Sequence, residues 1–407
     1  MNSKIIYLLV FALYFVNNCI GQLNYKYDNK LYPTIYPNDL YKFMKKNPNA
    51  VLVDVRTPGE FADTSRFGSL NIGHLKGAIN IEIDSILKDP MCLMQYQDQP
   101  IILYCSHSQR SRRGSKALKE SGFKEVYNLN AGMSYLNQAN SKKFPHKEEM
   151  IVSSLPYTNS SVAEIISLVE KNNDILIIDL RPAIQFEGKD TLESNNIGRI
   201  IKAINIPETE IKNRLLELEK YKSKTIVVYD INGALSHGVS KFLSENGFIK
   251  IHNILGGLSA IIGNENSTTK LRKRLLSNTP KYNILNAKEA VDFIKKNKKT
   301  LILDLRPQEE YINKSATVWK NLGSIKNSIN IPYNEFDVKI LTALIDKEGM
   351  ILIYGTDAMK YCKKLTELGF SNVNCLYGGI WSIISNSANI KERKDDRLVL
   401  QNNEGLY

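Results

Sequence analysis

The sequence predicts an α/β fold built from three tandem units, each a parallel sheet flanked by helices on both faces. The first observation is a repeat: an apolar, β-branched run ends in Asp-x-Arg at Asp54, Asp179 and Asp304, at intervals of 125 residues. The second is that these runs of Val, Ile and Leu lack polar alternation, which is typical of parallel strands covered on both faces. A chain of 407 residues is long enough for about three such domains.

Two further blocks keep the same register. The segments GAINI, KAINIP and NSINIP place their asparagines 125 residues apart. The apolar strands IILYC, IVVYD and ILIYG place Cys105, Asp230 and Gly355 at equivalent positions, each 51 residues after the aspartate of its own unit. Such internal repetition indicates three copies of one supersecondary arrangement.

Each unit is expected to open with a capped helix. Ser161-x-x-Glu164 and Asn286-x-x-Glu289 are capping boxes, in which the cap side chain and the glutamate satisfy free helix N–H groups reciprocally. Polar, basic segments near 140–156 and 264–281 are interpreted as linkers. The predicted organisation is a signal peptide over 1–21, units over 30–145, 155–265 and 282–390, and a charged tail over 391–407.

The N-terminus indicates export. Lys4 precedes an apolar run of 12 residues, Ile5 to Val16, which is too short to span a bilayer and matches a signal-peptide core. Cleavage after Gly21 would place the protein in the periplasm or cell envelope, or outside the cell. An alternative is a lipid anchor on Cys19. No later segment predicts a membrane helix, so any attachment would be by lipid.

The net charge of +12 does not predict a nucleic-acid partner. The basic residues are dispersed, mostly near predicted helix ends, as on a solvated surface. The denser runs at 270–274 and 391–397 do not interleave aromatic residues, which single-strand binding favours. No His and Cys spacing resembles a metal site, and no cofactor is predicted.

The chemistry is predicted where the third block of the first unit turns from strand into helix, in YCSHSQRS. A loop at the carboxyl end of a parallel strand that leads into a helix N-terminus directs backbone N–H groups and a positive dipole end at one point. An anion is favoured there. The thiolate of Cys105 would be stabilised at that point, and Arg110 would add a permanent cation.

These motifs resemble the rhodanese domain. The resemblance rests on DVRTPGEF at Asp54, GHLKGAINI at Gly73 and the Cys-x-x-x-x-Arg-Ser loop from Cys105 to Ser111, and it covers nearly the whole chain after the signal. It implies that Cys105 is the nucleophile, takes a sulfane sulfur as a persulfide and passes it to an acceptor such as cyanide or a thiol. It also implies a cradle and donor contacts formed by Ser106, His107, Ser108, Gln109 and Arg110.

The loop length favours sulfur chemistry. Four residues separate Cys105 from Arg110, whereas the related phosphatases have one residue more and a His-Cys pair. The loop also lacks the Cys-Gly-Ser-Gly-Val-Thr pattern of mercaptopyruvate enzymes, so its arginine favours a doubly charged inorganic donor such as thiosulfate. Ser108 stands where the family usually has glycine, and it would be strained if that position requires a positive φ.

The other two units are predicted to be inactive. In the second unit Asp230 replaces the cysteine, while the distance of 17 residues to Gly247 equals that from Cys105 to Gly122. An aspartate there repels anionic donors and resembles the inactive halves of tandem rhodaneses. In the third unit Gly355 replaces the cysteine, and the corresponding distance is only 14 residues, so the loop is shortened.

Several conspicuous residues are interpreted as structural. Asp54 and Arg56 are expected to form an internal polar anchor, as their equivalents do in the family, and His74 to hydrogen-bond within the GHLKGA turn. The remaining cysteines are read as buried hydrophobes: Cys92, Cys362 and Cys375. A disulfide between the last two is possible.

Two alternatives to an enzyme stay open. The chain could carry sulfane sulfur or polysulfide with little turnover, or it could be a non-enzymatic interaction protein built from three rhodanese folds. The sequence also leaves open the physiological donor and acceptor, the oligomeric state, and whether the units pack together.

Overall fold

The computed structural model describes residues 31–140, 143–172, 174–337 and 346–401. The predicted signal peptide, including Cys19, lies outside the described residues.

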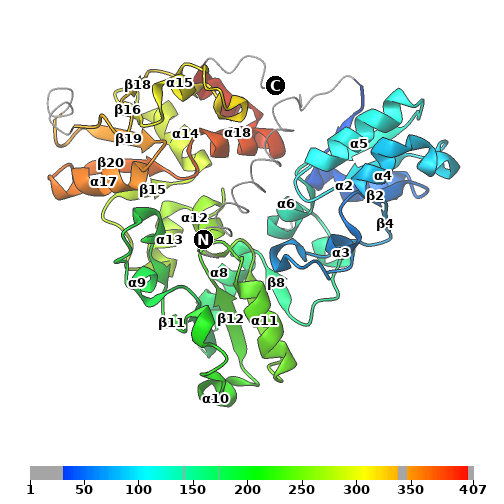
Figure 1. Cartoon of the computed structure of the whole chain (residues 1–407), viewed down its shortest axis with the longest axis horizontal. Helices are drawn as coiled ribbons and strands as arrows, with labels where there is room; N and C mark the ends of the chain where they lie inside the picture. The colour runs from blue at the N-terminus through cyan, green and yellow to red at the C-terminus, as the bar shows by residue number, and fades with distance from the viewer. Residues whose placement is uncertain (1–30, 141–142, 173, 338–345, 402–407) are drawn as a thin grey trace, which may run out of the picture.

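Three five-stranded parallel sheets share one strand order, which confirms the predicted fold class (Figure 1). The first contains β1 (Thr34–Ile35), β6 (Val126–Leu129), β5 (Ile101–Tyr104), β2 (Val51–Asp54) and β4 (Ile79–Asn80). The second contains β8 (Thr158–Ser160), β13 (Lys250–Ile254), β12 (Thr225–Tyr229), β9 (Ile175–Asp179) and β11 (Ile204–Asn205). The third contains β15 (Asn283–Leu285), β20 (Asn372–Leu376), β19 (Met350–Tyr354), β16 (Leu301–Asp304) and β18 (Ser328–Asn330).

Helices cover both faces of each sheet. The first unit has α2 (Pro37–Lys46), α3 (Pro58–Phe61), α4 (Ile83–Lys88), α5 (Gln109–Glu120) and α6 (Gly132–Gln138). The second has α8 (Val162–Lys171), α9 (Ala183–Phe186), α10 (Leu215–Leu218), α11 (Ser236–Glu245) and α12 (Gly257–Gly263). The third has α14 (Ala287–Lys296), α15 (Gln308–Tyr311), α17 (Ala358–Glu367) and α18 (Gly379–Asn389). The capping boxes predicted for α8 and α14 are both present.

Alternation along the strands divides the core of the first unit into two layers. Ile102 and Tyr104 of β5 pack with α2 and α6, whereas Ile101 and Leu103 pack with α4 and α5. Cys105 continues the second set and belongs to the layer under α4 and α5.

The segments that follow the three units are folded back onto them, which differs from the predicted linkers and tail. Each forms a short antiparallel pair with the segment that directly precedes the edge strand β4, β11 or β18 of its unit. The pairs are β3 (His74–Leu75) with β7 (Ile151–Val152), β10 (Arg199–Ile200) with β14 (Leu276–Ser277), and β17 (Ser324–Ile325) with β21 (Leu400–Gln401). The linkers also contain α7 (Lys147–Met150) and α13 (Thr269–Leu275), and the predicted tail contains the 3-10 helix η8 (Lys391–Val399). Backbone pairing therefore closes each unit.

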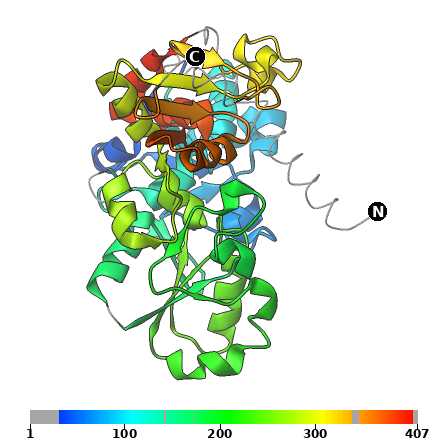
Figure 2. The same ribbon diagram turned by 90° about the vertical axis from the view of Figure 1, so that its left-hand side faces the viewer.

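The three units pack against one another around a common centre (Figures 1 and 2). Helix α6 contacts β8 of the second unit, α12 contacts β15 of the third, and the end of α18 contacts the first. Side-chain amides bond backbone carbonyls of neighbouring units, among them Gln138 to Leu255, Asn286 to Asn264, and Asn130 to Ala388, at 2.7, 2.9 and 2.7 Å. The units are thus not separate beads, and the third unit closes the arrangement on the first.

Lys202 provides a direct test of backbone strain in the second unit. This exposed residue has a φ of 62° in the turn between β10 and β11, where the equivalent residues are Gly77 and Asn327. Because the left-handed region costs a residue with a Cβ about 1 kcal/mol, Lys202→Gly should raise the free energy of unfolding by about 1 kcal/mol in a urea titration. Lys202→Ala keeps the Cβ and should not gain; equal gains for both variants would contradict this account.

His237 makes the junction of the first two units sensitive to acid. Its side chain on α11 is 2% exposed, lies beside Gly68 and has Nδ1 at 3.1 Å from the Tyr157 hydroxyl. Burial lowers the pKa of His237 to about 4, and the charge of Asp63 only partly opposes this. The imidazole is therefore neutral in the folded chain at pH values where the unfolded chain binds a proton.

Stability should therefore fall as the pH is lowered from about 6.5 towards 4, because the unfolded state binds the additional proton in that window. The expected loss is about 2 kcal/mol between about pH 6.5 and 4.5. Urea unfolding at a series of pH values would measure it. His237→Gln cannot titrate and should flatten that part of the profile; an unchanged slope would show that other groups cause it.

Candidate active site around Cys105

The Cys105 loop connects β5 to α5. Cys105 follows the last residue of the strand, is 1% exposed and packs into the core beneath α4 and α5. The Ser111 hydroxyl lies 3.8 Å from Sγ of Cys105 and also bonds Oδ1 of Asn128 at 2.7 Å. The cysteine predicted to be the nucleophile is thus held just before the start of α5, with the Ser111 hydroxyl beside its sulfur.

The start of α6 supports the loop from below. The N–H groups of Met133 and Ser134 donate to the carbonyls of Cys105 and Ser106, at 2.9 and 3.0 Å. Gly132 makes this approach possible, since a Cβ there would lie 2.3 Å from the Cys105 carbonyl oxygen. The carbonyls of Cys105 and Ser106 are therefore held in place by the first turn of α6.

Ser108 occupies a strained position, as the departure from glycine suggested. Its φ is 67°, and Gly233 at the equivalent place in the second unit has a φ of 81°. A left-handed conformation costs serine roughly 1 to 2 kcal/mol. Its hydroxyl donates to the Leu129 carbonyl at 3.1 Å, which offsets part of that cost.

Arg110 is not an isolated cation. Its guanidinium donates to both carboxylate oxygens of Glu60, at 2.6 and 2.8 Å, and to the Ser106 hydroxyl at 3.1 Å. Burial alone would raise the pKa of Glu60, but the hydrogen bond and charge of Arg110 outweigh it, and the pKa lies below its ordinary value. Burial likewise opposes the charge on Arg110, yet Glu60 and the nearby Cys105 raise its pKa. The pair is fully ionised at neutral pH.

Glu60 is a residue of the site that was not predicted from the sequence. It belongs to a capping box with Thr57 at the start of α3 and is 3% exposed. The sequence contains a signal that Glu60 and Arg110 belong together. In the second unit Gln185 replaces the glutamate and Leu235 replaces the arginine. The glutamate and the arginine are lost together there.

The remaining predicted loop residues have different surroundings. His107 is exposed at the tip of the loop, and Gln109 is the first residue of α5 and half-buried. Ser106 is 8% exposed and is engaged by Arg110 and by α6.

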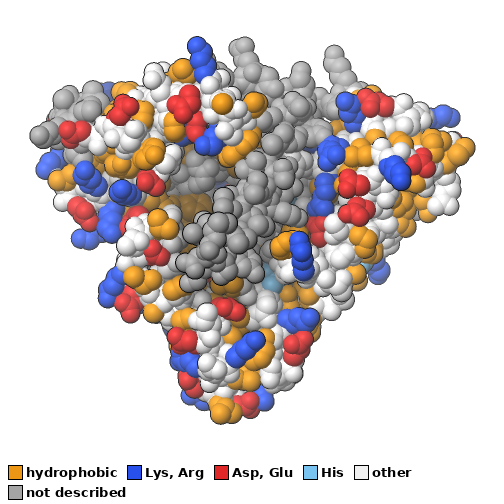
Figure 3. All heavy atoms as spheres, in the orientation of Figure 1, with side chains coloured by type: hydrophobic (Ala, Val, Ile, Leu, Met, Phe, Trp, Pro, Cys, Tyr) orange, Lys and Arg blue, Asp and Glu red, His pale blue; other side chains and the backbone are white. Residues whose placement is uncertain are grey.

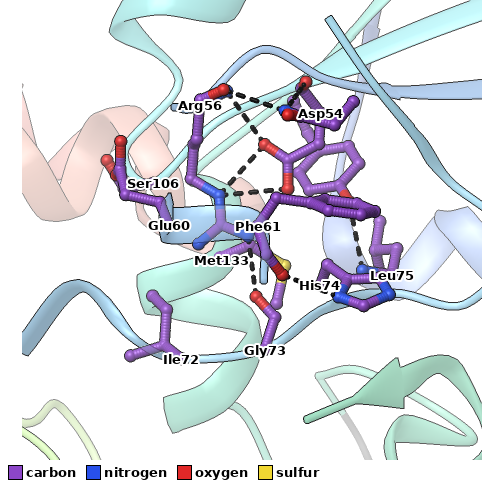
Figure 4. Close-up of polar contacts among 12 residues, drawn as sticks. Asp54, Arg56, Glu60, Phe61, Ile72, Gly73, His74, Leu75, Ser106 and Met133 are labelled. Carbon is purple, nitrogen blue, oxygen red and sulfur yellow. Dashed lines mark hydrogen bonds and ion pairs between the residues drawn. The ribbon is translucent and has the colours of Figure 1, made fainter. Parts of the chain in front are cut away.

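Asp54 and Arg56 form a buried ion pair beside the loop (Figure 4). The guanidinium donates to the Asp54 carboxylate at 2.7 Å and to the Gly73 carbonyl at 2.7 Å. The other two units repeat the arrangement, with the second pair bonding Gly198 and the third bonding Gly323. Its presence in units that lack a cysteine at the position of Cys105 is consistent with an internal anchor.

His74 bonds outside its own turn. Its Nδ1 lies 3.0 Å from the Phe61 carbonyl oxygen, and its ring stacks on the Phe61 ring with 4.1 Å between centroids (Figure 4). The histidine therefore joins the GHLKGA turn to the end of α3, whereas a bond within the turn was expected.

The second unit fills its own loop with a carboxylate. Asp230 is 1% exposed and accepts backbone N–H bonds from four residues, two of them at 3.0 and 3.2 Å. Those four donors are Asn232, Gly233, Leu235 and Ser236. Burial raises the pKa of Asp230, while these N–H groups oppose that rise. The loop is an anion cradle with an internal occupant.

The same register identifies the cradle of the first unit. The four equivalent donors lie 125 residues earlier, at His107, Ser108, Arg110 and Ser111. Three of them are among the residues predicted to bind the donor, and Ser111 is an addition. The carboxylate of Asp230 thus occupies the position equivalent to the Cys105 side chain.

The third unit has no equivalent loop. Gly355 has a φ of 101° and lies so close to Arg306 that a Cβ would be 2.9 Å from its backbone nitrogen. Cys362 and Cys375 are buried, as predicted, and both are free thiols. The prediction for Cys92 was wrong, because this residue is exposed.

Charges and metals add no second site among the described residues. Acidic and basic side chains are interspersed on the face drawn in Figure 3. No group of three His, Cys, Asp or Glu side chains in the described part of the chain is arranged to hold a metal. None of the described helices is long and apolar enough to cross a membrane.

Comparisons with known proteins find relatives of single units. The chain is 30% identical over 130 residues to the uncharacterized protein YqhL of Bacillus subtilis, which covers 32% of this chain and 90% of the relative. It is 30% identical over 104 residues to the thiosulfate sulfurtransferase GlpE of Stutzerimonas stutzeri, covering 26% and 85%. A tRNA uridine(34) hydroxylase of Buchnera aphidicola is 31% identical over 94 residues, and the chain spans only 27% of that relative.

A thiosulfate sulfurtransferase from Pseudomonas aeruginosa is among the similar solved structures, with 15% identity, a TM-score of 0.24, and coverage of 85% of this chain and 66% of that one. The model of the Rhodanese-like domain matches residues 36–139, 161–264 and 286–386. The chain therefore belongs to the rhodanese family and contains three tandem copies of its domain.

Proposed function

We propose that the chain is a sulfurtransferase that moves a sulfane sulfur from an anionic donor, such as thiosulfate, to a thiophilic acceptor through a persulfide on Cys105. The observation that carries the proposal is the filled loop of the second unit, where four backbone N–H groups surround a carboxylate at the position of Cys105. The family and the sulfurtransferase relative support the same chemistry.

The first step forms the persulfide. The Cys105 thiolate attacks the outer sulfur of thiosulfate, a new S–S bond forms, and the S–S bond of the donor breaks as sulfite leaves with its electron pair. The N–H groups of the loop and the dipole of α5 stabilise the negative charge on the transferred sulfur.

The second step returns the thiolate. A cyanide ion or thiolate attacks the outer persulfide sulfur, takes it up and releases Cys105 with the electron pair of the broken bond. The two steps are balanced without an external oxidant or reductant. Because Glu60 compensates the charge of Arg110, the backbone cradle carries most of the anion binding.

Intact-mass measurement tests the proposal. Protein treated with thiosulfate and then desalted should gain the mass of one sulfur atom. Cys105→Ser should abolish the adduct, whereas Cys92→Ser, which removes the exposed thiol, should retain it. A wild-type protein without the adduct, or an undiminished adduct in Cys105→Ser, would refute the function.

A carrier with little turnover is the second candidate, and the 1% exposure of Cys105 favours it. It predicts the same adduct but no thiocyanate when cyanide is added. A sulfurtransferase instead loses the adduct and releases thiocyanate in equal amount. If neither adduct nor thiocyanate forms, a non-enzymatic interaction role is favoured.

A further inference from the structure

The segment from Leu129 to Ser134 forms a platform under the Cys105 loop. The Leu129 carbonyl accepts from the Ser108 hydroxyl at 3.1 Å. At its other end, the N–H groups of Met133 and Ser134 hold the carbonyls of Cys105 and Ser106. The position of this platform therefore sets the position of the loop.

Asn130, the second residue of the platform, joins the loop helix α5 to the third unit. Its side chain is fully buried. Oδ1 accepts from the Arg112 guanidinium at 2.5 Å, and Nδ2 donates to the Ala388 carbonyl at 2.7 Å. Arg112 lies in the first turn of α5, where its backbone N–H bonds the Ser108 carbonyl at 3.1 Å. One amide thus connects α18 with the first turn of the helix that follows Cys105.

The Ala388 carbonyl lies in a part of α18 that is specific to the third unit. Helix α18 has 11 residues, whereas its counterparts α6 and α12 have 7 each. Ala388 lies in the additional turn. The contact with Asn130 thus depends on an extension that the other two units lack.

The two side chains that make the connection in the first unit are specific to that unit. The residues equivalent to Arg112 and Asn130 in the second unit are His237 and Leu255, neither of which can form this pair, and the third unit has Tyr377 in place of the asparagine. Among the described residues, this buried connection is found in the first unit, which has Cys105 at the loop position, and not at the equivalent positions of the other two.

We infer that Asn130 is a positioning residue and that the third unit, which has lost its own cysteine and loop, holds the Cys105 loop in its working conformation through α18. The inference concerns the order of the loop and rests on the proposed function only for its effect on sulfur transfer. The third unit then has a role in the site without touching the substrate.

Asn130→Ala tests this inference in the full chain, with Gln138→Ala as the matched control. Gln138 also donates to a carbonyl of another unit at 2.7 Å, but it lies at the far end of α6, away from the loop. The first readout is the rate at which iodoacetamide labels Cys105, measured by peptide mass relative to the exposed Cys92 in the same molecule. This readout does not depend on sulfur transfer.

The expected result has two parts. Asn130→Ala should raise the relative labelling of Cys105 about tenfold, because a buried amide with two partners is lost and the loop opens more often. The same variant should slow persulfide formation from thiosulfate by a similar factor. Gln138→Ala should change neither rate, even if it lowers the overall stability as much as Asn130→Ala does. Faster labelling together with slower persulfide formation in Asn130→Ala therefore identifies a positioning role.

Asn130→Asp separates the two halves of the connection. It keeps an acceptor for Arg112 but loses the donor to Ala388, so it should behave like Asn130→Ala if the third unit matters. Wild-type labelling in Asn130→Ala or in Asn130→Asp would overturn the inference. Another outcome is that the labelling rises as expected while neither the wild type nor any variant forms a persulfide. In that case the proposed function fails and the positioning role of Asn130 stands.

Discussion

Replacing Glu60 by alanine is expected to lower the free energy of unfolding by about 3 kcal/mol and to slow persulfide formation at least about tenfold. The variant leaves Arg110, whose side chain is 25% exposed, without its bidentate partner. A largely buried cation then either remains uncompensated or moves towards solvent, and the Ser106 hydroxyl that it bonds loses its fixed place. Urea unfolding and the initial rate of adduct formation would measure the two effects.

The third unit provides a matched control. Glu310 holds the place of Glu60, is 8% exposed and pairs with Lys320 at 2.8 Å, but no loop arginine is involved. Glu310→Ala should destabilise the chain to a smaller extent and leave the rate at Cys105 unchanged. If Glu60→Ala and Glu310→Ala slow the reaction equally, the ion pair has no particular role at the site.

Asp230→Ala is expected to have the largest effect on stability, a loss of about 4 kcal/mol. The substitution removes a carboxylate that is 1% exposed and accepts from four backbone N–H groups. Added sulfate should then raise the melting temperature of the variant more than that of the wild type, because an anion can occupy the vacated cradle. Thermal unfolding with and without sulfate would measure this, and persulfide formation at Cys105 should be unaffected.

Asp190→Ala serves as the comparison. This half-buried loop aspartate also accepts a backbone N–H bond, from Leu192 at 2.9 Å, but its loop does not enclose it. Its loss should cost about 1 kcal/mol and create no sulfate dependence. An equal sulfate response in both variants would mean that the second loop is not a preformed cradle.

Much of the fold could be predicted because it is repeated and local. The unbroken apolar strands and the two capping boxes depend on residues close together in the chain, and the 125-residue register repeats these local patterns; all appear in the structure. The same holds for the loop after β5 and for the strain at Ser108, since strand, turn and helix follow directly from one another.

The ends of the units could not be predicted in this way. The segments interpreted as linkers and tail are polar and basic, and composition alone favours an exposed chain. They are ordered because each pairs its backbone with a turn of its own unit, a contact whose partner lies about 75 residues earlier.

The sequence by itself determined the three-unit α/β architecture, the one cysteine at the end of a sheet strand and the loop that surrounds it. Only the tertiary structure decided what holds that loop. Glu60 and Arg110 are 50 residues apart, and Asn130 and Ala388 are 258 residues apart. Neither pair leaves a local pattern, because a buried ion pair or amide bond depends on how distant segments cross in space, and periodicity describes only neighbours along the chain.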